Sequence, residues 1–142
     1  MGRARDVVEA AYRAWNVGDL DAIMNDYDEN ATYWSTARMT GVHGKAEIRD
    51  YCKSQLRTFP GIRFAITSLI ESDDSVAVEY RVQATHNGPL ELPSGTMPPT
   101  GKTIDFVGAE FFEIPRGKIV TERNYLDSLE LMRQLGLMPA GK

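Results

Sequence analysis

The chain has 142 residues, of which 42% are hydrophobic and 25% charged, with a net charge of −4. A chain of this length can bury a core without disulfides or metals, so residues 1–142 are predicted to form a single domain. The negative charge argues against nucleic acid as a partner, because phosphate binding needs clustered Lys and Arg. No apolar run is long enough to cross a membrane, and Cys52 is the lone cysteine, so we expect a cytoplasmic protein without membrane contact.

Apolar residues recur at helical spacing in the first part of the chain. The pattern predicts helices over about residues 5–17, 19–27 and 44–58, with a short strand at about 31–35. In the first helix Tyr12 and Trp15 fall on the apolar face, and Asp19 is a suitable N-cap for the second. A bundle of helices therefore comes first in the chain.

The hydrophobic period changes to two beyond Gly61. Strands are predicted over about residues 62–71, 76–86, 103–114 and 118–125, followed by a final helix over 128–135. The stretch 87–102 is rich in Gly and Pro, so we expect a loop without regular structure that forms the rim of a pocket. Helices followed by a run of strands are typical of an α+β fold, in which a curved sheet wraps round the helices and leaves that pocket.

Several separated motifs narrow the fold further. The junction 15–22, Trp-Asn-Val-Gly-Asp-Leu-Asp-Ala, resembles the nuclear transport factor 2-like superfamily. Residues 84–88 (Ala-Thr-His-Asn-Gly), 98–102 (Pro-Pro-Thr-Gly-Lys) and the signature within 117–136 are similar to SnoaL-like proteins. The resemblance implies a cone-shaped barrel with three N-terminal helices against a curved, mostly antiparallel sheet and a short C-terminal helix.

The same resemblance implies a pocket enzyme with no metal or organic cofactor, built as a homodimer. The family's cyclases close the last ring of a polyketide by an intramolecular aldol condensation, so an apolar polyketide-like small molecule is the expected substrate. Their acid/base aspartate falls here on Asn124 and their companion histidine on Glu110. Loss of that aspartate keeps two alternatives open: an epoxide-opening hydrolase or cyclase, and a non-catalytic dimer that holds a small ligand.

The patterns of two related enzymes are largely missing. Of the epoxide hydrolase Arg-x-Asp motif only Arg81 is present, because Gln83 stands at the aspartate position. The aspartate that ketosteroid isomerases use in their oxyanion hole falls on Gly108. We therefore expect neither the epoxide hydrolase mechanism nor the ketosteroid isomerase mechanism to apply unchanged.

Glu110 is the leading candidate for proton transfer. It shares the alternating register of Phe106 and Phe112, and a carboxylate on an apolar strand face has a raised pKa that suits acid/base work. The structural alternative is an ion pair with Arg81 or Arg123 on neighbouring strands.

Three further residues are candidates for the catalytic site. Asn124 would polarise a substrate carbonyl if it faces the pocket, or would bond strand-end backbone groups instead. His86 could act as a general base or fix the loop that follows it. Asp127 lies in the family motif, but Asp127 and Glu130 also have the spacing of a capping box at the last helix.

The remaining candidates are the pocket walls. Core packing explains the aromatic residues equally well, and some could serve both roles. The predicted substrate-binding residues are Trp15, Tyr12, Tyr33, Trp34, Arg81, Gln83, Phe106 and Phe112. No metal site is expected, since two separated histidines and one cysteine match no ligand spacing. On the opposite strand face, Val107, Ala109 and Phe111 predict an apolar surface that packs against a second copy.

Overall fold

The computed structural model describes residues 3–38, 41–92 and 94–138. Four α-helices are α1 (Arg3–Val17), α2 (Leu20–Met24), α3 (Lys45–Thr58) and α4 (Ser128–Gln134), with a 3₁₀ turn η1 (Pro115–Gly117). The strands are β1 (Tyr27–Ser35), β2 (Val42–His43), β3 (Arg63–Ser72), β4 (Ser75–Thr85), β5 (Leu90–Leu92), β6 (Gly95–Met97), β7 (Thr103–Glu113) and β8 (Ile119–Leu126). None of the described helices has the length and apolar run needed to cross a bilayer.

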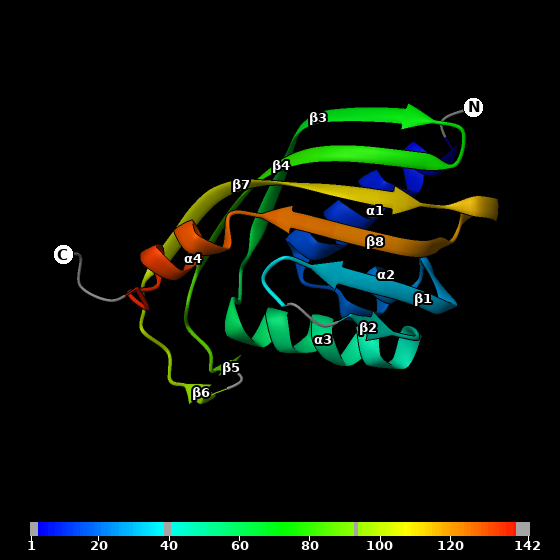
Figure 1. Ribbon diagram of the computed structural model, residues 1–142. Helices are drawn as coiled ribbons and strands as arrows, with labels where there is room; N and C mark the ends of the chain where they lie inside the picture. Colours follow the sequence, from blue (N-terminus) through cyan, green and yellow to red (C-terminus); the bar gives the residue numbers. More distant parts are fainter. Residues whose placement is uncertain (1–2, 39–40, 93, 139–142) are drawn as a thin grey trace.

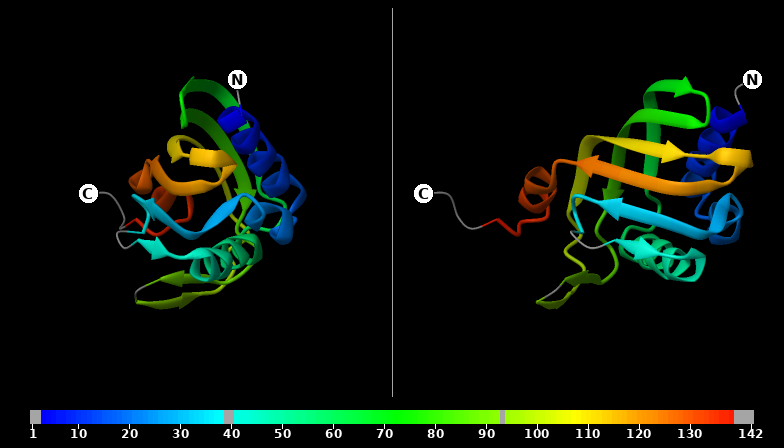
Figure 2. Two further views of the ribbon diagram at one scale, coloured as in Figure 1. Left: turned by 90° about the vertical axis from the view of Figure 1, so that its right-hand side faces the viewer. Right: turned by 45° about the vertical axis from the view of Figure 1, so that its right-hand side comes forward.

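One six-stranded sheet dominates the molecule, in the order β2-β1-β8-β7-β4-β3 (Figure 1). Neighbouring strands are antiparallel except β1 and β8, which run parallel. The sheet curves round α1 and α3, as the turned views in Figure 2 show. The predicted α+β class, with helices first, a curved and mostly antiparallel sheet and a short last helix, is confirmed.

The core lies between the concave face of the sheet and these helices. Val8, Ala11 and Tyr12 of α1 are buried, as the helical spacing predicts. On β4 every second residue from Val76 to Ala84 is buried. Burial of this apolar face supplies most of the stability of such a helix, because an isolated helix of α1's length is marginal in water.

Three local predictions differ from the structure. The second helix ends at Met24 rather than at 27, and β1 begins at Tyr27, four residues earlier than expected. Strand conformation at Tyr27 buries its ring and places its hydroxyl in the interior. The stretch 87–102 is not wholly irregular, because β5 and β6 pair as a two-stranded ribbon. Gly95, with φ +130, supports the tight connection.

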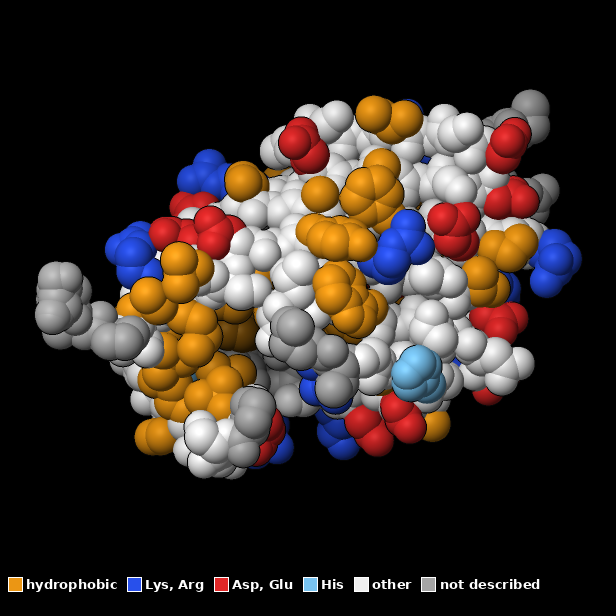
Figure 3. Space-filling model, viewed as in Figure 1, with side chains coloured by type: hydrophobic (Ala, Val, Ile, Leu, Met, Phe, Trp, Pro, Cys, Tyr) orange, Lys and Arg blue, Asp and Glu red, His pale blue; other side chains and the backbone are white. Residues whose placement is uncertain are grey.

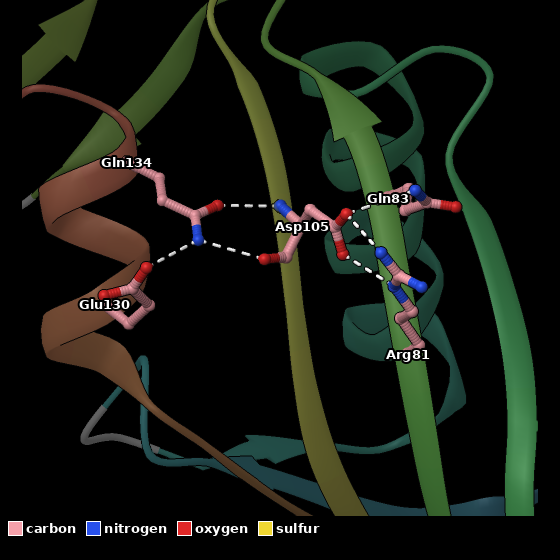
Figure 4. A network of polar contacts seen from close by, with 5 residues as sticks. All are labelled: Arg81, Gln83, Asp105, Glu130 and Gln134. Atoms are coloured by element: carbon pink, nitrogen blue, oxygen red, sulfur yellow. Dashed lines mark hydrogen bonds and ion pairs between the residues drawn. The ribbon is translucent and has the colours of Figure 1, made fainter.

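The side chain of Gln134 on helix α4 forms hydrogen bonds to the backbone of β7 (Figure 4). Its carbonyl oxygen accepts a hydrogen bond from the Asp105 backbone N–H at 2.7 Å, and its amide donates to the Asp105 carbonyl at 3.0 Å. The amide also donates to Glu130 at 2.7 Å. Strand β8 pairs with β7 only from Gly108 onward, so Gln134 takes the place of a strand partner at Asp105.

Candidate active site

A cavity of about 120 Å³ lies inside the cone. Its walls come from the concave face of the sheet and from α1, α3 and α4. In Figure 3 the surface is hollowed next to α4, where apolar side chains gather. The side chains with polar atoms that line the cavity are Tyr12, Trp15, Tyr27, Tyr33, Ser35, Tyr51, Cys52, Gln55, Tyr80, Glu110, Glu122 and Asn124. The lining residues include no Lys, Arg or His among those the structure describes.

Glu110 points into this cavity. The alternation along β7 places it on the concave face with Ile104 and Phe112, and only 6% of it is exposed. The Tyr12 hydroxyl of α1 donates a hydrogen bond to its carboxyl group at 2.5 Å. Burial raises the pKa of Glu110 well above its ordinary value of 4.5, and the neighbouring charge and hydrogen bond of Glu122 raise it further. Burial therefore favours the protonated form of the Glu110 carboxyl group.

Glu122 is the second buried carboxylate, and our sequence analysis missed it. It is 7% exposed, lines the same cavity and accepts a hydrogen bond from the Tyr27 hydroxyl. Glu110 lies opposite Asn124, and Phe112 opposite Glu122, so the two carboxylates are diagonal neighbours on adjacent strands. A signal was present: Glu122 is two residues from Asn124 on the same strand and so faces the same side of the sheet.

Asn124 also faces the cavity, but its carbonyl oxygen already has a partner. The Tyr80 hydroxyl donates to that oxygen at 2.7 Å, and the Asn124 amide donates to the Tyr33 hydroxyl at 3.2 Å. Gly108 explains how Tyr80 reaches this place. A Cβ at position 108 would lie 2.4 Å from the Tyr80 oxygen, so the missing side chain makes room for the hydroxyl.

The tyrosines around the cavity remain neutral hydroxyls. Burial, followed by the charge of Glu110, raises the pKa of Tyr12 and Tyr80. Burial raises the pKa of Tyr51 to about 12. The site is thus a network of hydroxyl and amide groups around two buried carboxyl groups.

Five of the eight predicted wall residues line the cavity: Tyr12, Trp15, Tyr33, Phe106 and Phe112. The other three, Trp34, Arg81 and Gln83, do not. Each belongs to the opposite register of its strand and lies on the convex face. Arg81 and Gln83 bond Asp105 there, as Figure 4 shows, at 2.7 and 3.2 Å, while Trp34 packs on Tyr125 with ring centroids 5.3 Å apart.

The structural alternative for Glu110 is wrong. Arg81 pairs with Asp105 outside, and the nearest acid to Arg123 is Glu113 at 4.0 Å. No ion pair joins Glu110 to a basic side chain within the described parts of the chain, and burial raises the pKa of its carboxyl group.

His86 and Asp127 lie away from the cavity. His86 is fully buried; its Nδ1 is 2.9 Å from the Thr100 hydroxyl, and its backbone bonds Gly101 and Lys102. It therefore fixes the connection after β4. Asp127 accepts from the Glu130 backbone N–H at 2.9 Å, which is an N-cap. No residue of 87–92 or 94–102 lines the cavity, so the prediction that this stretch forms the rim of the pocket is wrong.

No group of three His, Cys, Asp or Glu side chains within residues 3–38, 41–92 and 94–138 is arranged to hold a metal ion.

Comparison with known proteins agrees with this architecture. Three similar solved structures are AclR from Streptomyces galilaeus, a SnoaL-like protein from Jannaschia and an NTF2-like protein from Burkholderia pseudomallei. AclR is 24% identical, with a TM-score of 0.81, and the match covers 100% of this chain and 86% of AclR. The Jannaschia protein is 17% identical, with a TM-score of 0.83, and the match covers 96% of this chain and 94% of that protein. The Burkholderia protein is 16% identical, with a TM-score of 0.77, and the match covers 94% of this chain and 98% of that protein.

These likenesses show the nuclear transport factor 2-like fold. No curated protein matches the chain. The family model of the SnoaL-like polyketide cyclases, however, matches residues 5–135. With the curved sheet, the enclosed cavity and this match over nearly the whole length, the chain belongs to the SnoaL-like polyketide cyclase family.

Proposed function

We propose that this protein is a cofactor-independent cyclase that uses Glu110 and Glu122 as an acid/base pair on an apolar, polyketide-like substrate. The observation that carries the proposal is the pair of diagonal, buried carboxyl groups in an apolar cavity, one of them with a raised pKa. Two carboxyl groups whose environments separate their proton affinities are a common basis for acid/base assignments.

A pair that holds one proton can run a balanced aldol closure. Glu110 gives its proton to a substrate carbonyl oxygen while the Glu122 carboxylate removes a proton from the adjacent carbon, which forms an enol. The enol carbon then bonds to a second carbonyl carbon of the same molecule. Glu122 returns its proton to that second oxygen and the enol hydroxyl returns its proton to Glu110, so the reaction is an isomerisation and the pair is restored.

The tyrosine hydroxyls would set the roles of the two acids. Tyr12 donates to Glu110 and Tyr27 to Glu122, which holds both carboxyl groups in fixed orientations. Such preorganisation is the main way in which proteins stabilise charge that develops during a reaction. The cavity of about 120 Å³ is near the size, about 150 Å³, that encloses a single benzene ring, so a larger substrate would extend toward the opening beside α4.

Asn124 supports a second candidate, a non-catalytic ligand-binding module. The family's acid is absent here, and the amide that replaces it is held by Tyr33 and Tyr80. The epoxide-opening alternative has less support, because Arg81 lies on the convex face.

We further propose a homodimer that works in the cytoplasm. Val107 is 65% exposed, and Phe111 and Tyr125 are each 42% exposed on the convex face, where Figure 3 shows apolar side chains together. Covering such a patch with a second copy would remove it from water. The lone cysteine, Cys52, is buried and free, as is usual in a reducing compartment.

The test is hydrogen–deuterium exchange at the carbon next to the carbonyl of a small aromatic ketone in D₂O, followed by NMR. The wild type should accelerate exchange over buffer. Glu110→Gln keeps the shape and the Tyr12 contact but cannot transfer a proton, so exchange should fall by about 10²-fold or more. Glu79→Gln, on the convex side of β4, is the matched control and should exchange at the wild-type rate. Full exchange in the Glu110→Gln variant would refute the acid/base role.

A further inference from the structure

The cavity has an unbalanced charge. Two carboxyl groups line it, and no Lys, Arg or His among the described lining residues can neutralise them. Arg38 is exposed, and its guanidinium lies 5.4 Å from the centre of the ring of Tyr51, a residue of the cavity wall. A buried negative charge without a basic partner is costly, so a ligand of opposite charge would be favoured.

The hydrogen-bond donors of the cavity are largely used. The hydroxyls of Tyr12, Tyr27 and Tyr80 each donate to a side-chain oxygen inside the protein. The Tyr33 hydroxyl accepts from Asn124 and is bonded to Tyr51. The carboxyl oxygens of Glu110 and Glu122 can accept further hydrogen bonds. A ligand that donates a hydrogen bond or brings positive charge therefore complements the cavity, and a carboxylate or phosphate does not.

Aromatic rings make up much of the wall around these acids. Phe64 lies edge to face with both Tyr12 and Tyr80, with ring centroids 5.5 Å apart in each pair, and Trp15 packs on Phe64 at 5.9 Å. The rings of Tyr12 and Tyr80 are tilted to each other, with centroids 6.3 Å apart. Faces of Tyr and Trp attract cations, and the attraction grows when the cation is removed from water. We propose that the cavity binds an organic ammonium ion, a tertiary or quaternary amine whose charge meets the Glu110–Glu122 pair and whose alkyl groups meet the aromatic wall.

Size and protonation agree with this ligand class. A trimethylammonium head is compact and apolar apart from its charge, which suits a cavity of about 120 Å³. Because the ligand's charge replaces the proton of the pair, binding should release a proton, and affinity should rise with pH. The titratable groups that face the pair are Tyr12 of α1, Tyr27 and Tyr33 of β1, Tyr51 and Cys52 of α3, and Tyr80 of β4. Burial raises the pKa of each of these six groups.

The inference does not depend on the proposed proton transfer and is tested by binding. Three probes are titrated by calorimetry: tetramethylammonium, choline and benzyltrimethylammonium. The control ligand is 3,3-dimethylbutan-1-ol, which has the shape of choline without its charge. We expect choline to bind at least tenfold more tightly than the alcohol. Titrations in two buffers with different heats of ionisation should show proton release, and affinity should increase between pH 6 and 8.

Glu122→Gln should remove the preference for choline over the alcohol, whereas Glu79→Gln should retain it. Near-UV circular dichroism verifies that each variant is folded. If Glu122→Gln does not fold, Glu110→Gln is tested in its place. Equal affinity for choline and the alcohol, or no binding of any of the three cations, would overturn the inference. Neither result bears on the acid/base function, which the ketone exchange assay tests separately.

Discussion

Replacing Glu110 by Gln should change how stability depends on pH. Glu110 is buried, and burial is the main reason why the pKa of its carboxyl group in the folded chain is raised well above 4.5. Above pH 4.5 the unfolded chain loses this proton while the native chain keeps it, so the native state binds more protons. The free energy of unfolding then falls by about 1.4 kcal/mol for each pH unit until the native pKa is reached. The glutamine side chain does not titrate and lacks this penalty.

The measurement is urea unfolding of the wild type and of Glu110→Gln at pH 5, 6, 7 and 8, followed by circular dichroism. Subtracting one free energy from the other cancels the titration of groups far from position 110, so the difference reports on Glu110 together with its neighbour Glu122. The difference, wild type minus variant, should decrease as pH rises above 4.5 and become level once the native pKa of Glu110 is passed. Glu79→Gln, which removes an exposed carboxylate of β4, is the matched control. A flat difference for Glu110→Gln would mean that Glu110 titrates normally in the fold, and the reasoning about its burial would fail.

Three other substitutions test separate parts of the structure. Gly108→Ala places a methyl group 2.4 Å from the Tyr80 oxygen, so it should cost about 1–3 kcal/mol of unfolding free energy in urea; a neutral result would mean that Tyr80 moves freely. Asp127→Ala should lower stability by about 1 kcal/mol and leave ketone exchange unchanged, and a loss of exchange would give the residue a chemical role. Phe111→Glu should convert the proposed dimer to a monomer in light scattering, and a wild type that is already monomeric would contradict the interface.

Much of the fold could be predicted because its signals are local. Helical spacing places Tyr12 on the buried face of α1, and the alternation along β7 places Glu110 on the concave face. Each depends on a period that the sequence displays directly. The end of α2 could not be predicted in this way, because Tyr27 leaves the helical pattern to meet a partner 95 residues away.

The site was harder to predict for the same reason. Tyr12 and Glu110 are 98 residues apart, and their contact exists only after the helices pack on the sheet. Arg81 and Gln83 were assigned to the pocket from a related enzyme's motif, although their register on β4 puts them on the convex face. Register therefore predicted side-chain direction better than motif position did, and applied to β8 it would have found Glu122.

The attachment of Gln134 to Asp105 has a consequence for self-association. From Thr103 to Val107, β7 has no strand beside it on the β8 side, and an open backbone edge is a template on which another chain can add a strand. Gln134 satisfies both backbone groups of Asp105 with a side chain that cannot propagate the ladder. Helix α4 thus covers the open edge of β7 as well as forming a wall of the cavity. If α4 detached from β7, the backbone groups of Asp105 would be free to pair with a strand of another molecule, which would favour aggregation.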